Sequence, residues 1–436
     1  MPERLLQLVP PHLLREASAR AFGIRTSHFF DTCVGGGSLP DADVRNFVAS
    51  GGPKLIEESS SARAWQWSVR KLDRALRSGG SAIPLDAMDH IELDSTRSGR
   101  LPELLFWQLL VLLASQALAG DRSFEWSVDY PPPKSLYLPG TGRLDLNDEP
   151  LPGRYRVSVD RGWFQLSSSA GGVVAALDAM AACGSPTSGF VPALRIGTNS
   201  CLAFDDHALR RQYFQPFPLL LGRRANLEFS RQIGRCWDAL IAEGPPGLDA
   251  VLGLCDSLIG LCSLTESVGS GSREEALGLV FLPAGTDDEN LAECLLHEAL
   301  HQYLFHVEES TDLFAEHSSK AENFYSPWRT DGRPLRMVLH GAFVFSGVAN
   351  LHVRWHRSPG SFEGNLATAS RRVEESLVAL DVVKRHALLT PVGQKIVRAI
   401  DAELAHSQAY LADAFDDPNA RSIAQQRRHE FPELVA

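Results

Sequence analysis

The sequence predicts a helix-rich α+β protein in which a histidine-bearing helix lies beside a small β-sheet. Three observations support this fold class. Residues 1–125 and 286–436 carry apolar residues at spacings of three and four, the period of an amphipathic helix. Residues 126–285 instead contain short alternating or β-branched runs separated by turns rich in proline and glycine. The C-terminal region holds two histidines four positions apart, in the stretch HEALH at 297–301.

The composition indicates a water-soluble globular protein. Hydrophobic residues make up 44% of the chain and charged residues 22%, and the net charge of −11 would repel the phosphates of nucleic acid. No uninterrupted apolar run reaches the ~18 residues that a membrane span needs, so we expect no membrane partner. The first 23 residues lack a continuous apolar signal segment, and the seven cysteines include no C-x-x-C pair. We therefore expect a cytoplasmic protein without a disulfide framework.

The first predicted region, residues 1–125, consists of helices interrupted by glycine-rich breaks. Its most apolar part is LPELLFWQLLVLLASQALAG at 101–120. Although this stretch is nearly long enough to cross a membrane, Glu103, Gln108, Ser115 and Gln116 favour a buried core helix.

The second region, residues 126–285, mixes strands and helices. The runs RYRVSVDRGWFQLS, VPALRIGTNSCLAF and ALGLVFLP predict strands, and GVVAALDAMAAC, LEFSRQIGRCWDALIAE and GLDAVLGLCDSLIGLCSL predict helices between them. We expect the strand in ALGLVFLP, at 276–283, to lie at a sheet edge beside the histidine helix, where an extended peptide can add as a further strand.

The third region, residues 286–436, is helical, and its first helix carries HEALH. The segment DDEN at 287–290 supplies an N-terminal cap and an acidic first turn. Because residues four apart lie above one another on a helix, His297 and His301 point at one place, with Glu298 one residue round. This spacing predicts a divalent metal site, and the alternative is a pair of surface histidines.

Two imidazoles hold a divalent ion weakly, so a third ligand is expected. The downstream candidates are His306, Glu308, Glu309, Glu316, His317, Glu322 and His340. His306 lies about 140° around the helix from His301, and Glu308 lies about 10 Å along the axis, beyond the reach of a ligand. Leu304 and Val307 replace the glycine and histidine of a metzincin and exclude that family.

Two candidates for the third ligand remain open. A zinc metallopeptidase of the gluzincin kind would use Glu316 or Glu322, with Glu298 as general base for the metal-bound water. His340 lies in LRMVLHGAFVF, a helix so apolar that it must be buried. There it is either a ligand or a core histidine bonded to a backbone carbonyl.

Residues 255–405 resemble a known family. The segment FYSPWRTDGRPLRMVLHGAFVFSGVA at 324–349, after HEALH, is similar to the HExxH-motif 2-oxoglutarate-dependent peptide β-hydroxylases encoded beside ribosomally made peptides. LLTPVGQKIV at 388–397 resembles their closing helix. The other matching residues are Ser270, Ser272, Gly278, His297, Glu298, His301, Tyr325, Pro327, Trp328, Arg329, Arg333, Pro334, His340, Gly341 and Phe345.

The resemblance implies an Fe(II) enzyme that uses 2-oxoglutarate to hydroxylate a side-chain β-carbon of a ribosomally synthesised precursor peptide. Its ligands would be His297, His301 and His340, and Glu298 would orient a ligand or the substrate. Because two ligands come from one helix, we do not expect the double-stranded β-helix barrel usual for such oxygenases.

The cosubstrate's distal carboxylate needs a cation, and the planar fork of arginine suits it. Arg329 and Arg333 match the family motif, and Arg336 lies one turn before His340. Tyr325 either lines the same pocket or packs in the core. The alternative for Arg329 and Arg333 is a surface pair with Asp331, and the alternative for the whole chain is a peptide-binding scaffold with a degenerate metal site.

Overall fold

The computed structural model describes residues 10–14, 41–50, 101–133, 135–146, 152–169, 172–178, 190–196, 200–202, 223–261, 269–315, 323–358 and 360–414, with scattered positions between 16 and 66. The chain divides into two compact units. One comprises 1–17, 233–254 and 286–436, and the other comprises 18–232 and 255–285. Both units are assembled from discontinuous segments of the chain.

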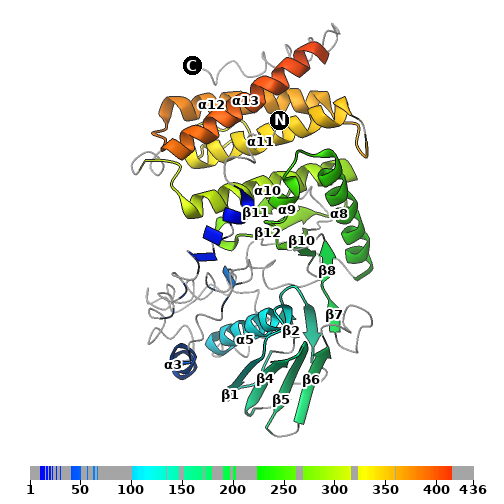
Figure 1. The fold of residues 1–436 in the computed structure, drawn as a ribbon, viewed down its shortest axis with the longest axis vertical. Coiled ribbons are helices and arrows are strands. Elements are labelled where there is room, and N and C mark those ends of the chain that lie inside the picture. Colours follow the sequence, from blue (N-terminus) through cyan, green and yellow to red (C-terminus); the bar gives the residue numbers. More distant parts are fainter. Residues whose placement is uncertain are drawn as a thin grey trace. The chain divides into compact units, whose positions relative to one another are not determined.

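The second unit contains an antiparallel four-stranded sheet in the order β1-β4-β5-β6 (Figure 1). Its strands are β1 (Phe124–Val128), β4 (Tyr155–Asp160), β5 (Trp163–Ser168) and β6 (Gly172–Asp178). In β4, buried and outward residues alternate, as expected when one face of a sheet is covered. The apolar helix α5 (Leu101–Ala119) packs against β1, β4 and β5, which confirms that it is a core helix. A short helix, α3 (Asp41–Ala49), precedes it.

Two smaller sheets complete this unit. β2 (Ser135–Leu138), β3 (Gly142–Asp145) and β7 (Phe190–Pro192) form one of them, in the order β2-β3-β7. The other is mixed and has the order β11-β12-β10-β9-β8. Its strands are β8 (Leu194–Ile196), β9 (Ser200–Leu202), β10 (Ser257–Leu261), β11 (Gly271–Ser272) and β12 (Leu279–Pro283), with a 3-10 turn, η4 (Glu274–Ala276), before β12.

The prediction that the strand in 276–283 lies at a sheet edge is wrong. β12 pairs in parallel with β10 on one side and antiparallel with β11 on the other. All five of its residues are buried, as in an interior strand, which carries a continuous apolar run. The proposed peptide addition at β12 is therefore blocked by the chain's own residues 271–272.

Two segments predicted as helices contain strands. Residues 172–178, in GVVAALDAMAAC, form β6 against β5, and residues 257–261, in GLDAVLGLCDSLIGLCSL, form β10 after the short helix α9 (Leu248–Leu252). Short apolar runs fit a helix and a buried strand equally well, and pairing with neighbouring strands decided between them. The helix predicted from LEFSRQIGRCWDALIAE is confirmed as α8 (Arg223–Glu243).

The first unit is built on four long helices, as predicted: α10 (Asp288–Ser310), α11 (Leu335–Arg357), α12 (Leu366–His386) and α13 (Pro391–Ala414) (Figure 1). α11 packs against the other three. The predicted cap of α10 is confirmed, because the Asp287 carboxylate accepts the backbone N–H of Asn290 at 2.8 Å. Asn365 caps α12 in the same way by accepting the Thr368 N–H at 2.9 Å.

The helix-rich α+β class is confirmed. Among the described residues the strands form open sheets, and none closes into a barrel. No described helix is both long enough and apolar enough to cross a membrane.

Candidate metal centre

The candidate centre is built on one face of α10, where it packs on α11. His297 and His301 come from α10 and His340 from α11, and all three belong to the same compact unit. The rings of His297 and His301 touch edge to face, with 4.9 Å between their centroids, as the spacing of four residues requires. Helix packing brings His340, thirty-nine positions after His301, against the second of them.

His301 and His340 face each other through the same ring atom. Their Nδ1 atoms are 3.3 Å apart and their ring planes differ by 19°. Two nitrogens bound at about 2.0–2.1 Å to one tetrahedral ion lie roughly 3.3 Å apart. The pair therefore has the separation that two ligands of one ion require.

The other nitrogen of His340 is held by a carboxylate. Its Nε2 lies 3.0 Å from Oε2 of Glu308, and the Arg336 guanidinium donates two hydrogen bonds to the same carboxylate, at 2.8 and 2.6 Å. Burial alone would raise the pKa of Glu308, but His340 and Arg336 lower it to about 2. An ionised carboxylate only accepts hydrogen bonds, so Nε2 of His340 carries a proton, and in the neutral tautomer with that proton the lone pair lies on Nδ1.

The two histidines of the HEALH motif are neutral at pH 7. Burial first, and then the positive charge of Arg372, lowers the pKa of His297 to about 4 against the opposing charge of Glu293. Burial, reinforced by His297 and His340, holds the pKa of His301 well below its usual 6.5. A metal needs deprotonated imidazoles, and these two are in that state without one.

Three imidazoles are suitable ligands for a metal ion, and one pair of their nitrogens, Nδ1 of His301 and Nδ1 of His340, has the separation of two ligands of one ion. Nδ1 of His340 is oriented by Glu308, Nδ1 of His301 faces it, and neutral His297 lies against the ring of His301. Within the described part of the chain, no three His, Cys, Asp or Glu side chains are already arranged around one point as ligands. The three proposed ligands are therefore neighbours, and His301 and His340 are at the separation expected for two ligands of one ion.

Two further residues of α10 are placed as the helix geometry requires. Glu298 is buried, and its Oε1 lies 3.9 Å from Nε2 of His297. His306 faces away from the pair, as predicted, and its Nδ1 donates to the carbonyl of Gln302 at 2.8 Å. The gluzincin candidates Glu316 and Glu322, and His317, lie outside the described residues.

The three arginines predicted to bind the cosubstrate each lie beside an acidic side chain of the protein. Asp331 lies 3.3 Å from Nε of Arg329 and 3.6 Å from Nε of Arg333, the surface pairing given above as the alternative. Backbone hydrogen bonds between Phe324 and Arg333 close the intervening loop. Arg336 is bound to Glu308 by both nitrogens of one edge. Tyr325 is half-buried in the same loop.

An aromatic wall borders His297. The Phe345 ring lies 4.8 Å from the ring of His297, Trp328 stacks on Phe345 at 4.7 Å, and the Arg372 guanidinium lies 4.2 Å from the Phe345 centroid. Gly341 permits this packing, because a Cβ there would come within 2.2 Å of Cζ3 of Trp328. Trp328 and Gly341 of the family-like segment are therefore in contact.

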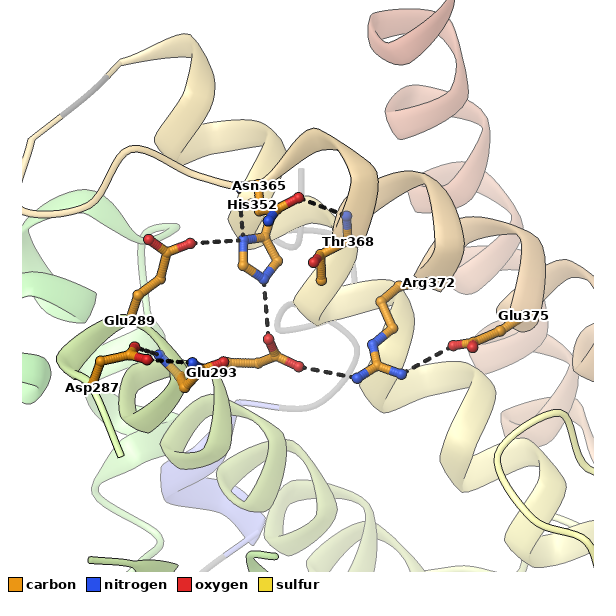
Figure 2. A network of polar contacts seen from close by, with 9 residues as sticks. Asp287, Glu289, Glu293, His352, Asn365, Thr368, Arg372 and Glu375 are labelled. Carbon is orange, nitrogen blue, oxygen red and sulfur yellow. Dashed lines mark hydrogen bonds and ion pairs between the residues drawn. The ribbon is translucent and has the colours of Figure 1, made fainter. Parts of the chain in front are cut away.

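A second polar cluster lies along the same face of α10, one turn before His297 (Figure 2). Glu293 accepts from Nε2 of His352 at 3.2 Å and from Nη2 of Arg372 at 3.3 Å. Nδ1 of His352 accepts the backbone N–H of Asn365 at 3.2 Å. Arg372 reaches on to Glu375, whose Oε2 also accepts the indole N–H of Trp328. Burial would raise the pKa of Glu293, but His352 and Arg372 lower it.

The sequence did not assign roles to Glu308, Glu293, His352, Arg372 or Glu375. Two of them carried a usable signal, because Glu293 precedes His297 by four residues and Glu308 follows His301 by seven, so all share one helix face. The sequence argument placed Glu308 too far along the axis to be a ligand, and its contact with His340 depends on the packing of α11. His352, Arg372 and Glu375 come from other helices and carried no local signal.

No family model matches this chain, and no curated protein matches it. The resemblance to peptide hydroxylases therefore remains a prediction from the motifs within residues 255–405.

Proposed function

We propose that this protein is an Fe(II)- and 2-oxoglutarate-dependent oxygenase that hydroxylates a side-chain β-carbon of a ribosomally synthesised precursor peptide. The observation that carries the proposal is the pairing of His301 and His340 through Nδ1 atoms 3.3 Å apart, with the proton of His340 held on Nε2 by Glu308. This arrangement supports His340 as the third ligand beside His297 and His301, rather than as a core histidine bonded to a carbonyl.

Each residue has a defined task in this proposal. Neutral His297 and His301 and the Nδ1 of His340 would hold Fe(II), which leaves the remaining positions for cosubstrate and O₂. When bound, the iron supplies the oxidation: one oxygen atom of O₂ enters the substrate C–H bond, and the other enters the succinate formed as 2-oxoglutarate loses CO₂. Glu308 and Arg336 keep His340 in the required tautomer. Glu298, buried beside His297, orients that ring.

The test is product analysis with anaerobically reconstituted protein. Protein loaded with Fe(II) is mixed with 2-oxoglutarate, O₂ and synthetic precursor peptides from the open reading frames that neighbour its gene. We expect one succinate per modified peptide and a mass gain of one oxygen atom. The matched control is His306→Ala, which removes a histidine of the same helix that faces away from the site and should retain this activity.

Turnover of a peptide in the absence of 2-oxoglutarate would overturn the proposal. So would unchanged succinate formation in the His340→Ala variant, because the third ligand would then lie elsewhere.

The second candidate is a zinc metallopeptidase with Glu298 as general base. The position of Glu298, 3.9 Å from Nε2 of His297, favours it, because a base for a metal-bound water must lie beside the ligands. This candidate predicts peptide cleavage with zinc, loss of cleavage with retained zinc in Glu298→Gln, and loss of zinc in Glu316→Ala or Glu322→Ala.

A further inference from the structure

Arg372 is a cation beside the proposed centre that has no role in holding the metal there. It extends from α12 over the Phe345 ring, which also contacts His297 and Trp328. Its charge is the second cause, after burial, of the low pKa of His297. The side chains of Arg372 and His297 are 18% and 19% exposed, so neither is fully enclosed by the protein.

The guanidinium is held in a fixed plane and keeps donor capacity. Nη1 donates to Glu375 at 3.0 Å, and Nη2 donates to Glu293 at a longer 3.3 Å. The Nε–H is buried and has no hydrogen-bond partner among the described residues. Nε and Nη2 form the edge of the guanidinium that fits a carboxylate with two parallel hydrogen bonds. A buried N–H without a partner costs about 1–3 kcal/mol, which a bound carboxylate would offset.

The other arginines near the motif are committed elsewhere. Arg336 already donates to Glu308 from its own Nε and Nη2. If Arg336 turned toward a cosubstrate, the carboxylate that orients His340 would lose these two hydrogen bonds. Arg329 and Arg333 share Asp331. Although Nε of Arg333 is also buried without a hydrogen bond, it lies 3.6 Å from the Asp331 carboxylate.

The charge of the site is suited to an anion once an ion is bound. Glu293 and Glu375 each accept a hydrogen bond from one terminal nitrogen of Arg372. A divalent ion on neutral imidazoles keeps its full charge, because no carboxylate ligand offsets it. A 2-oxo diacid bound to this ion through its head would need a cation for its second carboxylate, and Arg372, over the ring that contacts His297, is such a cation.

We propose that Arg372, held over Phe345 by Glu293 and Glu375, is the residue that binds the distal carboxylate of a 2-oxo diacid. This inference rests on the proposed function and replaces Arg329, Arg333 and Arg336 in the role that the sequence assigned to them. In this proposal Trp328 and Arg372 both donate hydrogen bonds to Glu375, and these bonds hold the guanidinium in place over Phe345.

The test compares two ligands that differ at the distal end alone. Protein loaded anaerobically with Mn(II) is titrated calorimetrically with 2-oxoglutarate and with 2-oxovalerate, in which a methyl group replaces the distal carboxylate. A charge-assisted bidentate contact contributes about 1.5–3 kcal/mol, so wild-type protein should bind 2-oxoglutarate about 10- to 100-fold more tightly. In Arg372→Gln this preference should disappear, with the affinity for 2-oxovalerate unchanged.

The matched control is Arg371→Gln, which removes an exposed arginine of the same helix and should leave both affinities unchanged. Arg372→Lys keeps the charge and loses the fork, so it should recover only part of the preference. A preference that survives in Arg372→Gln, or a loss of affinity for both acids alike, overturns the inference and leaves the proposed oxygenase standing. Failure of wild-type protein to bind either acid overturns the proposed function itself.

Discussion

Two glutamates on one face of α10 are each bound by an arginine and a histidine, but the two histidines differ in what their second ring nitrogen contacts. Glu308 is bound by Arg336 and His340, and Glu293 is bound by Arg372 and His352. In both triads the histidine comes from α11 and offers Nε2 to the carboxylate. Nδ1 of His340 faces His301, whereas Nδ1 of His352 accepts the backbone N–H of Asn365.

The comparison shows that the partner of the second ring nitrogen decides whether a buried histidine can bind a metal. His352 has both ring nitrogens occupied by protein groups, so it joins α10 to the loop before α12 and has no lone pair for a metal. His340 keeps one nitrogen directed at another imidazole. An ionised glutamate behind a histidine is therefore insufficient evidence of a metal ligand, because the same pair also serves as an interhelical clamp.

The strongest test of the comparison replaces each histidine by alanine. His340→Ala should lower Fe(II) affinity by more than the roughly 10- to 100-fold typical of losing an outer partner, because a ligand itself is removed. His352→Ala should leave Fe(II) affinity unchanged and lower the free energy of unfolding by about 1–3 kcal/mol, since Glu293 and the Asn365 N–H lose a partner. Anaerobic metal titration and urea unfolding measure the two effects. Equal loss of Fe(II) affinity in both variants would contradict the assignment of His340, and not His352, as a metal ligand.

A second prediction concerns the loop that occupies Nδ1 of His352. Gly364 has φ +76°, and a Cβ there would lie 2.4 Å from the His352 carbonyl oxygen and 2.5 Å from the His356 nitrogen. Gly364→Ala should lower the free energy of unfolding by about 2–5 kcal/mol, from left-handed backbone strain and overpacking against rigid backbone. Gly140→Ala, at φ +70° with nothing within 4 Å, is a control for the strain alone and should cost less.

A third prediction removes the charge of each glutamate. Glu308→Gln should weaken Fe(II) binding about 10- to 100-fold, because His340 loses the ionised acceptor that fixes its proton on Nε2. Glu293→Gln should leave Fe(II) affinity within about twofold, since it contacts a histidine with no open nitrogen. Metal titration at one pH checks both, and the ranking would be contradicted if Glu293→Gln caused the larger loss.

The smallest expected effect is a dependence on pH. The pKa of Glu308 falls from 4.5 to about 2 in the fold, so its contribution to stability is complete above pH 4.5 and is lost as the pH falls toward 2. Between pH 5 and pH 3 wild-type protein should therefore lose about 2 kcal/mol more unfolding free energy than Glu308→Gln. Urea unfolding across this range measures the difference. Parallel curves for the two proteins would show that His340 and Arg336 do not stabilise the carboxylate.

The fold was predictable where a pattern was long and failed where it was short. α5 is a long apolar run, α8 and the helices from α10 onward repeat an apolar spacing over many turns, and their prediction is confirmed. β6 and β10 are seven and five residues long, too short to distinguish a helix from a strand, and pairing with distant residues decided them. β12 was recognised as a strand, but its neighbour β11 is only two residues long and left no signal.

The sequence by itself determined the capped helix and the shared face of His297 and His301, and it gave the pairing of Arg329 with Asp331 only as an alternative to binding the cosubstrate. These follow from the rise and turn of one helix or from adjacency in a short loop. Only the tertiary structure decided that Nδ1 of His340 faces His301, that both ring nitrogens of His352 contact other protein groups, and that Arg372 lies over the Phe345 ring beside His297. Those properties depend on groups from three helices meeting in a buried layer, and no local period records which distant side chain occupies a given ring nitrogen.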